Sequence, residues 1–127
     1  MVLVDSSVWI EYFKGNEKVK PLEALIDLNA VCINDLILAE LMPSIWHKKE
    51  MELGELVLAI PKIPMDINWE SIINMQTLNL KNGINKVGIA DLIIIQNAIY
   101  NGLDLFSLDK HFELMSSLHK LRLYKAK

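Results

Sequence analysis

Four carboxylates occupy positions in this sequence where they could act on the same substrate. Asp5 directly follows the apolar run Val2–Val4, and Asp109 directly follows a second short apolar stretch. Glu40 and Asp91 lie inside longer apolar segments. If the two apolar runs form neighbouring strands, all four side chains can converge at the carboxyl edge of one sheet, where ligands bind in open α/β folds. Each acid alone is more simply explained as a helix cap or a surface charge, so the hypothesis depends on the joint pattern.

Four carboxylates in one pocket repel one another unless cations neutralise them. Hard divalent cations take oxygen ligands, which points to Mg²⁺ or Mn²⁺. Two such ions roughly 3.5–4 Å apart can clamp a phosphodiester and activate a water. The sequence has no His and Cys set at zinc spacing, no phosphate-binding glycine loop and no G-x-S-x-G serine motif. The pattern therefore favours metal-dependent phosphodiester hydrolysis.

The elements that must position these acids alternate between short apolar strands and longer amphipathic helices. We predict strands at residues 2–4, 30–33, 62–63, 104–108 and 121–124. We predict helices over residues 7–13, 17–28, 36–42, 50–60, 69–80, 87–100 and 110–118. Ser6 or Ser7 should cap the first helix, and Pro43 should kink or interrupt the third. This alternation indicates a three-layer α/β/α sandwich with a mostly parallel, four- to five-stranded central sheet.

Length, charge and composition set further limits. The 127 residues suit one domain, and we assign residues 1–127 to a single domain. The net charge of −3 argues against a protein that holds nucleic acid by basic charge alone, so bound divalent cations would have to assist. The apolar fraction of 52% is high for a small monomer and suggests a subunit or partner interface.

Cysteine usage and apolar segments bear on the compartment. The one cysteine, Cys32, excludes an internal disulfide and fits a reducing, cytoplasmic setting. Its apolar neighbours favour a buried strand position over a role as nucleophile. Asp5 interrupts the first apolar run, which is unlike a signal peptide, and the charge-free stretch 92–103 is too short to span a bilayer. We therefore expect a cytoplasmic protein without a membrane partner.

Four segments of the chain, taken in order, resemble PIN-domain ribonucleases of the VapC type, the toxins of toxin–antitoxin pairs. The segments are VDSSVWI at 4–10, LILAEL at 36–41, GIADLII at 88–94 and FSLDKHF at 106–112. The first and last are the most specific, and together the four cover almost the whole chain. The resemblance implies a PIN-like fold and a metal-dependent endoribonuclease that acts as the toxin of a type II toxin–antitoxin system. It also implies RNA products with a 5′-phosphate and a 3′-hydroxyl.

The resemblance further implies which residues and partners take part. The implied catalytic, metal-binding acids are Asp5, Glu40, Asp91 and Asp109, and the implied cofactor is Mg²⁺ or Mn²⁺. Ser6 would orient Asp5 or a water at the metal, and Ser107 would hydrogen-bond into the acidic cluster. RNA would be the substrate. A small cognate antitoxin would occupy the site, and the chain would form a homodimer.

The sequence departs from the family pattern in places. The glycine that often follows the family's glutamate is absent after Glu40. His111 follows Asp109 by two residues and could reach a metal or a phosphate, but we interpret it as a structural contact and leave it outside the metal set. We interpret Asp35 as a helix cap and Asp104 as a strand-start residue.

Three alternative hypotheses about function remain beside the nuclease. A catalytically inactive PIN-fold binding module would share the fold, although all four acids are present. A phosphoacceptor receiver domain needs an early acidic pair, and Asp5 has no acidic neighbour. A phosphatase with a D-x-D nucleophile motif would need an acid at the position of Ser7.

Overall fold

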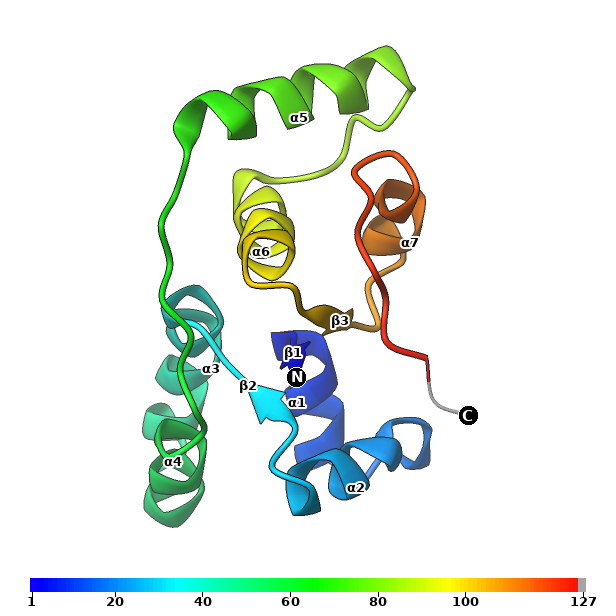
Figure 1. Cartoon of the computed structure of the whole chain (residues 1–127). Coiled ribbons are helices and arrows are strands. Elements are labelled where there is room, and N and C mark those ends of the chain that lie inside the picture. The colour runs from blue at the N-terminus through cyan, green and yellow to red at the C-terminus, as the bar shows by residue number, and fades with distance from the viewer. Residues whose placement is uncertain (126–127) are drawn as a thin grey trace.

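A computed structural model, which describes residues 1–125, places three short parallel strands at the centre of the chain (Figure 1). The strands are β1 (Val2–Val4), β2 (Val31–Cys32) and β3 (Asp104–Phe106), in the spatial order β2-β1-β3. Both outer strands run parallel to β1, so the three carboxyl ends meet at one edge of the sheet. The residue that follows β1 therefore lies at the middle of that edge.

Helices cover both faces of the sheet, with α1 and α6 on opposite sides (Figure 1). In residues 1–125 there are seven α-helices and one 3₁₀-helix: α1 (Ser6–Phe13), η1 (Glu17–Val19, the 3₁₀-helix), α2 (Pro21–Asp27), α3 (Asp35–His47), α4 (Met51–Leu58), α5 (Trp69–Lys81), α6 (Ile89–Tyr100) and α7 (Lys110–Ser116). The predicted α/β architecture with a parallel sheet between helical layers is confirmed. None of the helices in this range is long and apolar enough to cross a membrane.

The sheet is narrower than the four or five strands predicted from the sequence. Across residues 1–125, the two outermost predicted strands are reduced to single bridges, between Ile33 and Lys62 and between Leu105 and Leu123. Prolines at positions 61 and 64 flank the first of these segments, and a proline donates no hydrogen bond to a ladder. The second segment pairs with β3 through two backbone bonds, from Leu105 N to the Arg122 carbonyl at 2.9 Å and from Tyr124 N to the Leu105 carbonyl at 2.8 Å.

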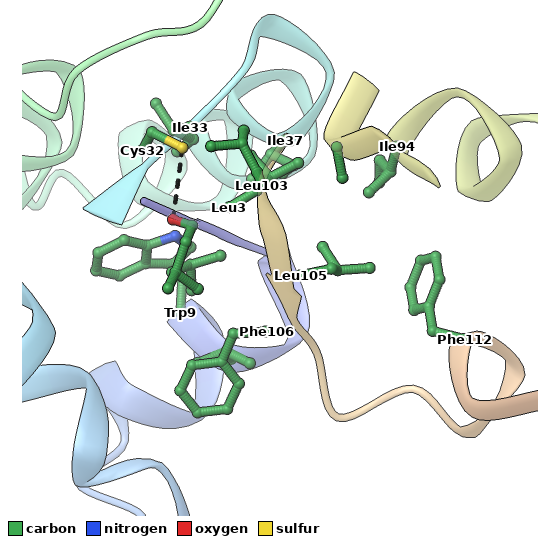
Figure 2. Packing of buried hydrophobic residues seen from close by; sticks show 14 of the residues in the cluster. Leu3, Trp9, Cys32, Ile33, Ile37, Ile94, Leu103, Leu105, Phe106 and Phe112 are labelled. Atoms are coloured by element: carbon green, nitrogen blue, oxygen red, sulfur yellow. Dashed lines mark hydrogen bonds between the residues drawn. The ribbon is translucent and has the colours of Figure 1, made fainter. Parts of the chain in front are cut away.

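The core is built on the strands and on α6, in which every residue from 92 to 98 is buried. Leu105 of β3 is fully buried, and its side chain points toward Ile94 of α6 and Phe112 of α7 (Figure 2). Cys32 is also buried, and its Sγ donates to the Val2 carbonyl at 3.4 Å (Figure 2). Burial raises the pKa of the Cys32 thiol to about 11, so the thiol is protonated near neutral pH and is a poor nucleophile.

Pro21 divides the segment 17–28, which the sequence pattern predicts as one helix. The structure has η1 up to Val19 and then α2, which begins at Pro21. Proline suits the first position of a helix, because its missing N–H would have no partner there. The prediction of one continuous helix is therefore wrong.

Pro43 lies inside α3, so the predicted alternative of an interruption is wrong, and the alternative of a kink stays a prediction. The helix continues through Pro43 to His47. A proline inside a helix removes one backbone hydrogen bond and crowds the preceding turn. Here Met42 and Ile45, on either side of it, are buried in the core, and this packing holds the helix together. The five remaining predicted helices 7–13, 50–60, 69–80, 87–100 and 110–118 match the structure within two residues at each end.

Candidate metal centre

Asp5 lies where β1 passes into α1, and its backbone is fixed from both sides. Its N–H donates to the Phe106 carbonyl of β3 at 2.9 Å, and its carbonyl accepts from Val8 N at 3.1 Å. Asp5, and not Ser6 or Ser7, is the N-terminal cap residue of α1, but its carboxylate makes no capping bond. Asp5 is only 5% exposed. The carboxylate is therefore held at the sheet edge without being used to start the helix.

Two hydroxyls hold one oxygen of the Asp5 carboxylate. Ser7 Oγ donates to Asp5 Oδ2 at 2.8 Å, and Ser107 Oγ donates to the same atom at 2.9 Å. The same hydroxyls accept from the loop after β3, Ser7 Oγ from Leu108 N at 3.1 Å and Ser107 Oγ from Asp109 N at 3.0 Å. Asp5 and Asp109 are thus joined through Ser107. Within residues 1–125 Asp5 Oδ1 receives no hydrogen bond and stays available as a ligand.

Glu40 lies on α3, whose position is set by a pair of buried amides. Asn34 caps α3 by accepting from Ile37 N at 2.8 Å, and its Nδ2 donates to Asn97 Oδ1 of α6 at 2.8 Å. This bond links α3, which carries Glu40, to α6, which carries Asp91. Ser6 Oγ donates to Glu40 Oε1 at 3.4 Å, which is a long contact.

Asp91 and Asp109 each lie at the start of a helix. Asp91 is in the first turn of α6 and Asp109 is the N-terminal cap of α7, where a helix favours negative charge. Asp109 Oδ1 accepts from His111 N at 2.9 Å. Both acids are partly buried. A carboxylate oxygen of Asp91 and one of Asp109 lie within 4.8 Å of each other.

The pKa of Glu40 is raised above its ordinary value. Partial burial has the largest effect, followed by the negative charges of Asp5 and Asp91, while the hydrogen bond from Ser6 opposes the rise. Glu40 still retains exposed surface, so water screens these effects in part. The repulsion nevertheless indicates that Asp5, Glu40 and Asp91 lie close together.

The pKa of Asp91 is also raised. Burial again has the largest effect, followed by the charges of Asp109 and Asp5, while His111 opposes the rise. Repulsion thus links Asp5, Glu40 and Asp91 to one another and Asp91 to Asp109. The structure brings together all four acids that the sequence pattern singled out.

The donor atoms of this cluster suit a divalent cation. Asp91, Asp109 and His111 each offer one ligand atom, and these atoms all lie within 4.8 Å of one another. Carboxylate oxygens are ligands of Mg²⁺ and Mn²⁺, and imidazole is a common ligand of later transition ions. A bound cation would also relieve the repulsion that raises the pKa of Glu40 and Asp91. The residues present therefore fit a metal ion.

Three side chains of the cluster bear on the sequence interpretation. We expected Ser6 to orient Asp5 or a water at the metal, and in the structure its Oγ donates to Glu40 Oε1. Ser7, interpreted only as a possible helix cap, is one of the two hydroxyls on Asp5. His111 lies with Asp91 and Asp109, although we left it outside the metal set. A serine two residues after the acid that starts a helix was the signal for Ser7, because that spacing folds the hydroxyl back onto the carboxylate.

The raised pKa values of Glu40 and Asp91 predict how the metal-free protein responds to pH. In the unfolded chain these carboxyls titrate near pH ~4, and in the folded chain they titrate higher. Below pH ~4 both carboxyls are protonated, and their contribution to the free energy of unfolding is fully present. That contribution is lost as the pH rises through the folded-state pKa values. In EDTA, the Glu40→Gln, Asp91→Asn double variant should be more stable than wild type near neutral pH.

Urea unfolding followed by circular dichroism at several pH values measures this difference. The gap between the two proteins should shrink as the pH falls toward about 4, where the wild-type carboxyls are protonated. A saturating divalent cation should raise the stability of wild type but not that of the double variant. A wild-type protein that is the more stable of the two near neutral pH in EDTA would contradict the prediction.

Comparisons with known proteins agree with this geometry. The model of the PIN domain family matches residues 2–118. The fold is similar to that of VapBC2 from Rickettsia felis, solved bound to a DNA fragment from their promoter, with a TM-score of 0.76, 18% identity and 100% of each chain covered. It is also similar to FitAcB from Neisseria gonorrhoeae, with a TM-score of 0.76, 19% identity, and 98% of this chain and 97% of that chain covered.

At 18% and 19% identity, the similarity to the solved structures establishes the fold alone. The comparison with curated proteins gave no significant match. The PIN domain family model matches residues 2–118, which is nearly the whole chain. The matched range includes all four acids, together with β1 and β3, the strands that precede Asp5 and Asp109. The chain therefore belongs to the PIN domain family.

Proposed function

We propose that this chain is a metal-dependent endoribonuclease that acts as the toxin of a type II toxin–antitoxin system. Residues 1–127 would form its single domain. The catalytic and metal-binding acids would be Asp5, Glu40, Asp91 and Asp109. Membership of the PIN domain family supports a nuclease, and the sequence resemblance to VapC-type toxins supports RNA as the substrate.

The observation that carries the proposal is the mutual repulsion of acids that are far apart in the sequence. The charges of Asp5 and Asp91 raise the pKa of Glu40, and the charge of Asp109 raises the pKa of Asp91. Four acids from four separate segments rarely meet by chance, because their repulsion destabilises the fold. Such a cluster is expected where a cation supplies the balancing charge.

The proposed centre takes Mg²⁺ or Mn²⁺, held by the four acids. When bound, the ion would supply positive charge and Lewis acidity to the phosphodiester. Ser7 and Ser107 fix one oxygen of Asp5, so the carboxylate cannot rotate away from the site. Holding a ligand in this way reduces the reorganisation needed when the substrate binds.

Hydrolysis also needs a group that takes a proton from the attacking water. The carboxylates of Glu40 and Asp91 are the candidates for this proton acceptor. Glu40 is the more accessible of the two. Attack of the water on phosphorus, with release of the 3′-oxygen, would leave a 5′-phosphate and a 3′-hydroxyl.

The proposal includes two protein partners, a small cognate antitoxin and a second copy of the chain. Large apolar side chains are exposed on helices, among them Trp69 (58% exposed) and Ile73 (64%) of α5. With Leu80 and Ile89 these side chains line a depression of about 350 Å³. An exposed apolar surface of this kind suits a subunit or partner interface.

One buried free cysteine and no disulfide within residues 1–125 support a cytoplasmic setting.

An RNA cleavage assay with and without EDTA tests the proposed function. Purified protein and a mixed pool of end-labelled tRNA and mRNA should give discrete fragments in Mn²⁺ or Mg²⁺. EDTA should stop the reaction, and excess metal should restore it. End-group analysis should find 5′-phosphates on the new fragments.

A contaminating ribonuclease is excluded by testing a variant that lacks one of the acids, purified in the same way. Cleavage that persists in EDTA would contradict the proposal. A protein that cleaves no RNA and shows no thermal shift with Mn²⁺ would instead be the inactive binding module.

A further inference from the structure

His111 lies at the edge of the acidic cluster, in the first turn of α7. Its Nδ1 is 3.2 Å from Asp109 Oδ1, and its side chain is 38% exposed. One of its ring nitrogens lies within 4.8 Å of a carboxylate oxygen of both Asp91 and Asp109. Across the part of the chain that the structure describes, this is the one group of three or more His, Cys, Asp or Glu side chains whose ligand atoms come this close.

The capping of α7 does not account for this position of the ring. The backbone N–H of His111 already bonds to Asp109 Oδ1 at 2.9 Å, and any residue except proline could supply that donor. The imidazole adds a ring nitrogen that lies within 4.8 Å of a carboxylate oxygen of both Asp91 and Asp109. His119, by contrast, bonds through Nε2 to Asn79 Oδ1 at 2.7 Å, away from any such group of acids in residues 1–125.

We propose that His111 is a nitrogen ligand of the metal centre and gives it a preference for a first-row transition ion over Mg²⁺. Mg²⁺ prefers oxygen ligands and holds several waters, whereas imidazole binds ions later in the row more strongly. Asp91, Asp109 and His111 form a mixed oxygen and nitrogen set, which differs from a centre made of carboxylates alone. This inference rests on the proposed function, because it assumes that the acidic cluster holds a metal.

Direct detection of the metal–nitrogen bond tests the inference. Metal-stripped protein is loaded with Mn²⁺, and pulsed electron paramagnetic resonance is used to find coupling to a coordinated ¹⁴N nucleus. Wild type and the control His47→Ala should show the coupling, and His111→Ala should lose it. His47 lies in the last turn of α3 and is exposed, which makes its removal a matched loss of one imidazole.

Calorimetric titration with Co²⁺ and Mg²⁺ measures the preference itself. His111→Ala should weaken Co²⁺ binding by at least about tenfold, the scale on which partners at metal sites act. Its Mg²⁺ affinity should change by less than about threefold, because Mg²⁺ gains little from imidazole. His111→Gln serves as a second variant if the alanine variant folds poorly.

The outcomes separate the inference from the proposed function. If wild type binds Mn²⁺ without ¹⁴N coupling, or if His111→Ala weakens both ions equally, His111 is not a selective ligand and the inference fails while the nuclease proposal stands. If wild type binds none of Mn²⁺, Co²⁺ and Mg²⁺, the cluster is not a metal centre, and both proposals fail.

Discussion

Replacing Asp5 with asparagine is expected to lower RNA cleavage by about 10²–10³-fold or more, because it removes a charge that the transition state needs. Asp5 is the most buried of the four acids and the one at the middle strand of the sheet. Asparagine keeps the size of the side chain and can still accept the hydrogen bonds of Ser7 and Ser107. The loss should therefore appear in the single-turnover rate at saturating Mn²⁺, with little loss of folded protein.

The same substitution should leave the metal-free protein as stable as wild type or more stable. Asp5 contributes to the repulsion that raises the pKa of Glu40 and Asp91, and its removal relieves that repulsion. Urea unfolding in EDTA measures this.

Asp35→Asn is the matched control for Asp5→Asn. Asp35 is exposed at the start of α3, and its Oδ1 is 3.0 Å from Lys62 Nζ at the surface. Losing one exposed ion pair should change cleavage by less than about twofold, since such pairs contribute little. Full activity of Asp5→Asn at saturating metal would remove Asp5 from the catalytic set.

Replacing Leu105 with alanine is expected to lower the free energy of unfolding by about 2–5 kcal/mol, because the cavity cannot be refilled. Leu105 is fully buried between the sheet and α6. The expected loss is a large share of the roughly 5–15 kcal/mol that stabilises a typical domain. Ser107 and Asp109 follow Leu105 by two and four residues, so the loss should also weaken metal binding.

Leu114→Ala is the control for Leu105→Ala, since it removes the same atoms from a side chain that is 59% exposed on α7. Its free energy of unfolding should change by less than about 0.5 kcal/mol. Chemical denaturation gives both values, and Mn²⁺ titration of each variant at a temperature where it is folded gives the effect on the centre. Equal destabilisation by the two variants would show that β3 does not organise the core as described.

The sequence predicted the parts of the fold that depend on local patterns. The apolar run before Asp5 became β1, and the long apolar segment around Asp91 became α6. Hydrophobic periodicity carries such information because burial selects it directly. The four acids could be grouped from sequence because each follows a strand or lies in a helix at the same edge of a parallel sheet.

The rest depended on contacts between distant residues. Pro43 has a strong local preference to end a helix, and the packing of its neighbours overrode it. The bond between Asn34 and Asn97 joins residues 63 positions apart, and no local pattern indicates it. The approach of His111 to Asp91 likewise requires α6 and α7 to be placed in space.

The narrow sheet has a consequence for how other proteins can approach the chain. An exposed outer strand can accept a strand from a partner or from another copy and so extend the sheet. Here β2 has two residues and β3 has three. Irregular segments already form bridges there, Lys62 with Ile33 next to β2 and Leu123 with Leu105 of β3. Neither edge therefore offers a long row of free backbone groups within residues 1–125. The addition of a partner's strand is therefore disfavoured at both edges, and so is aggregation by edge-to-edge pairing of strands.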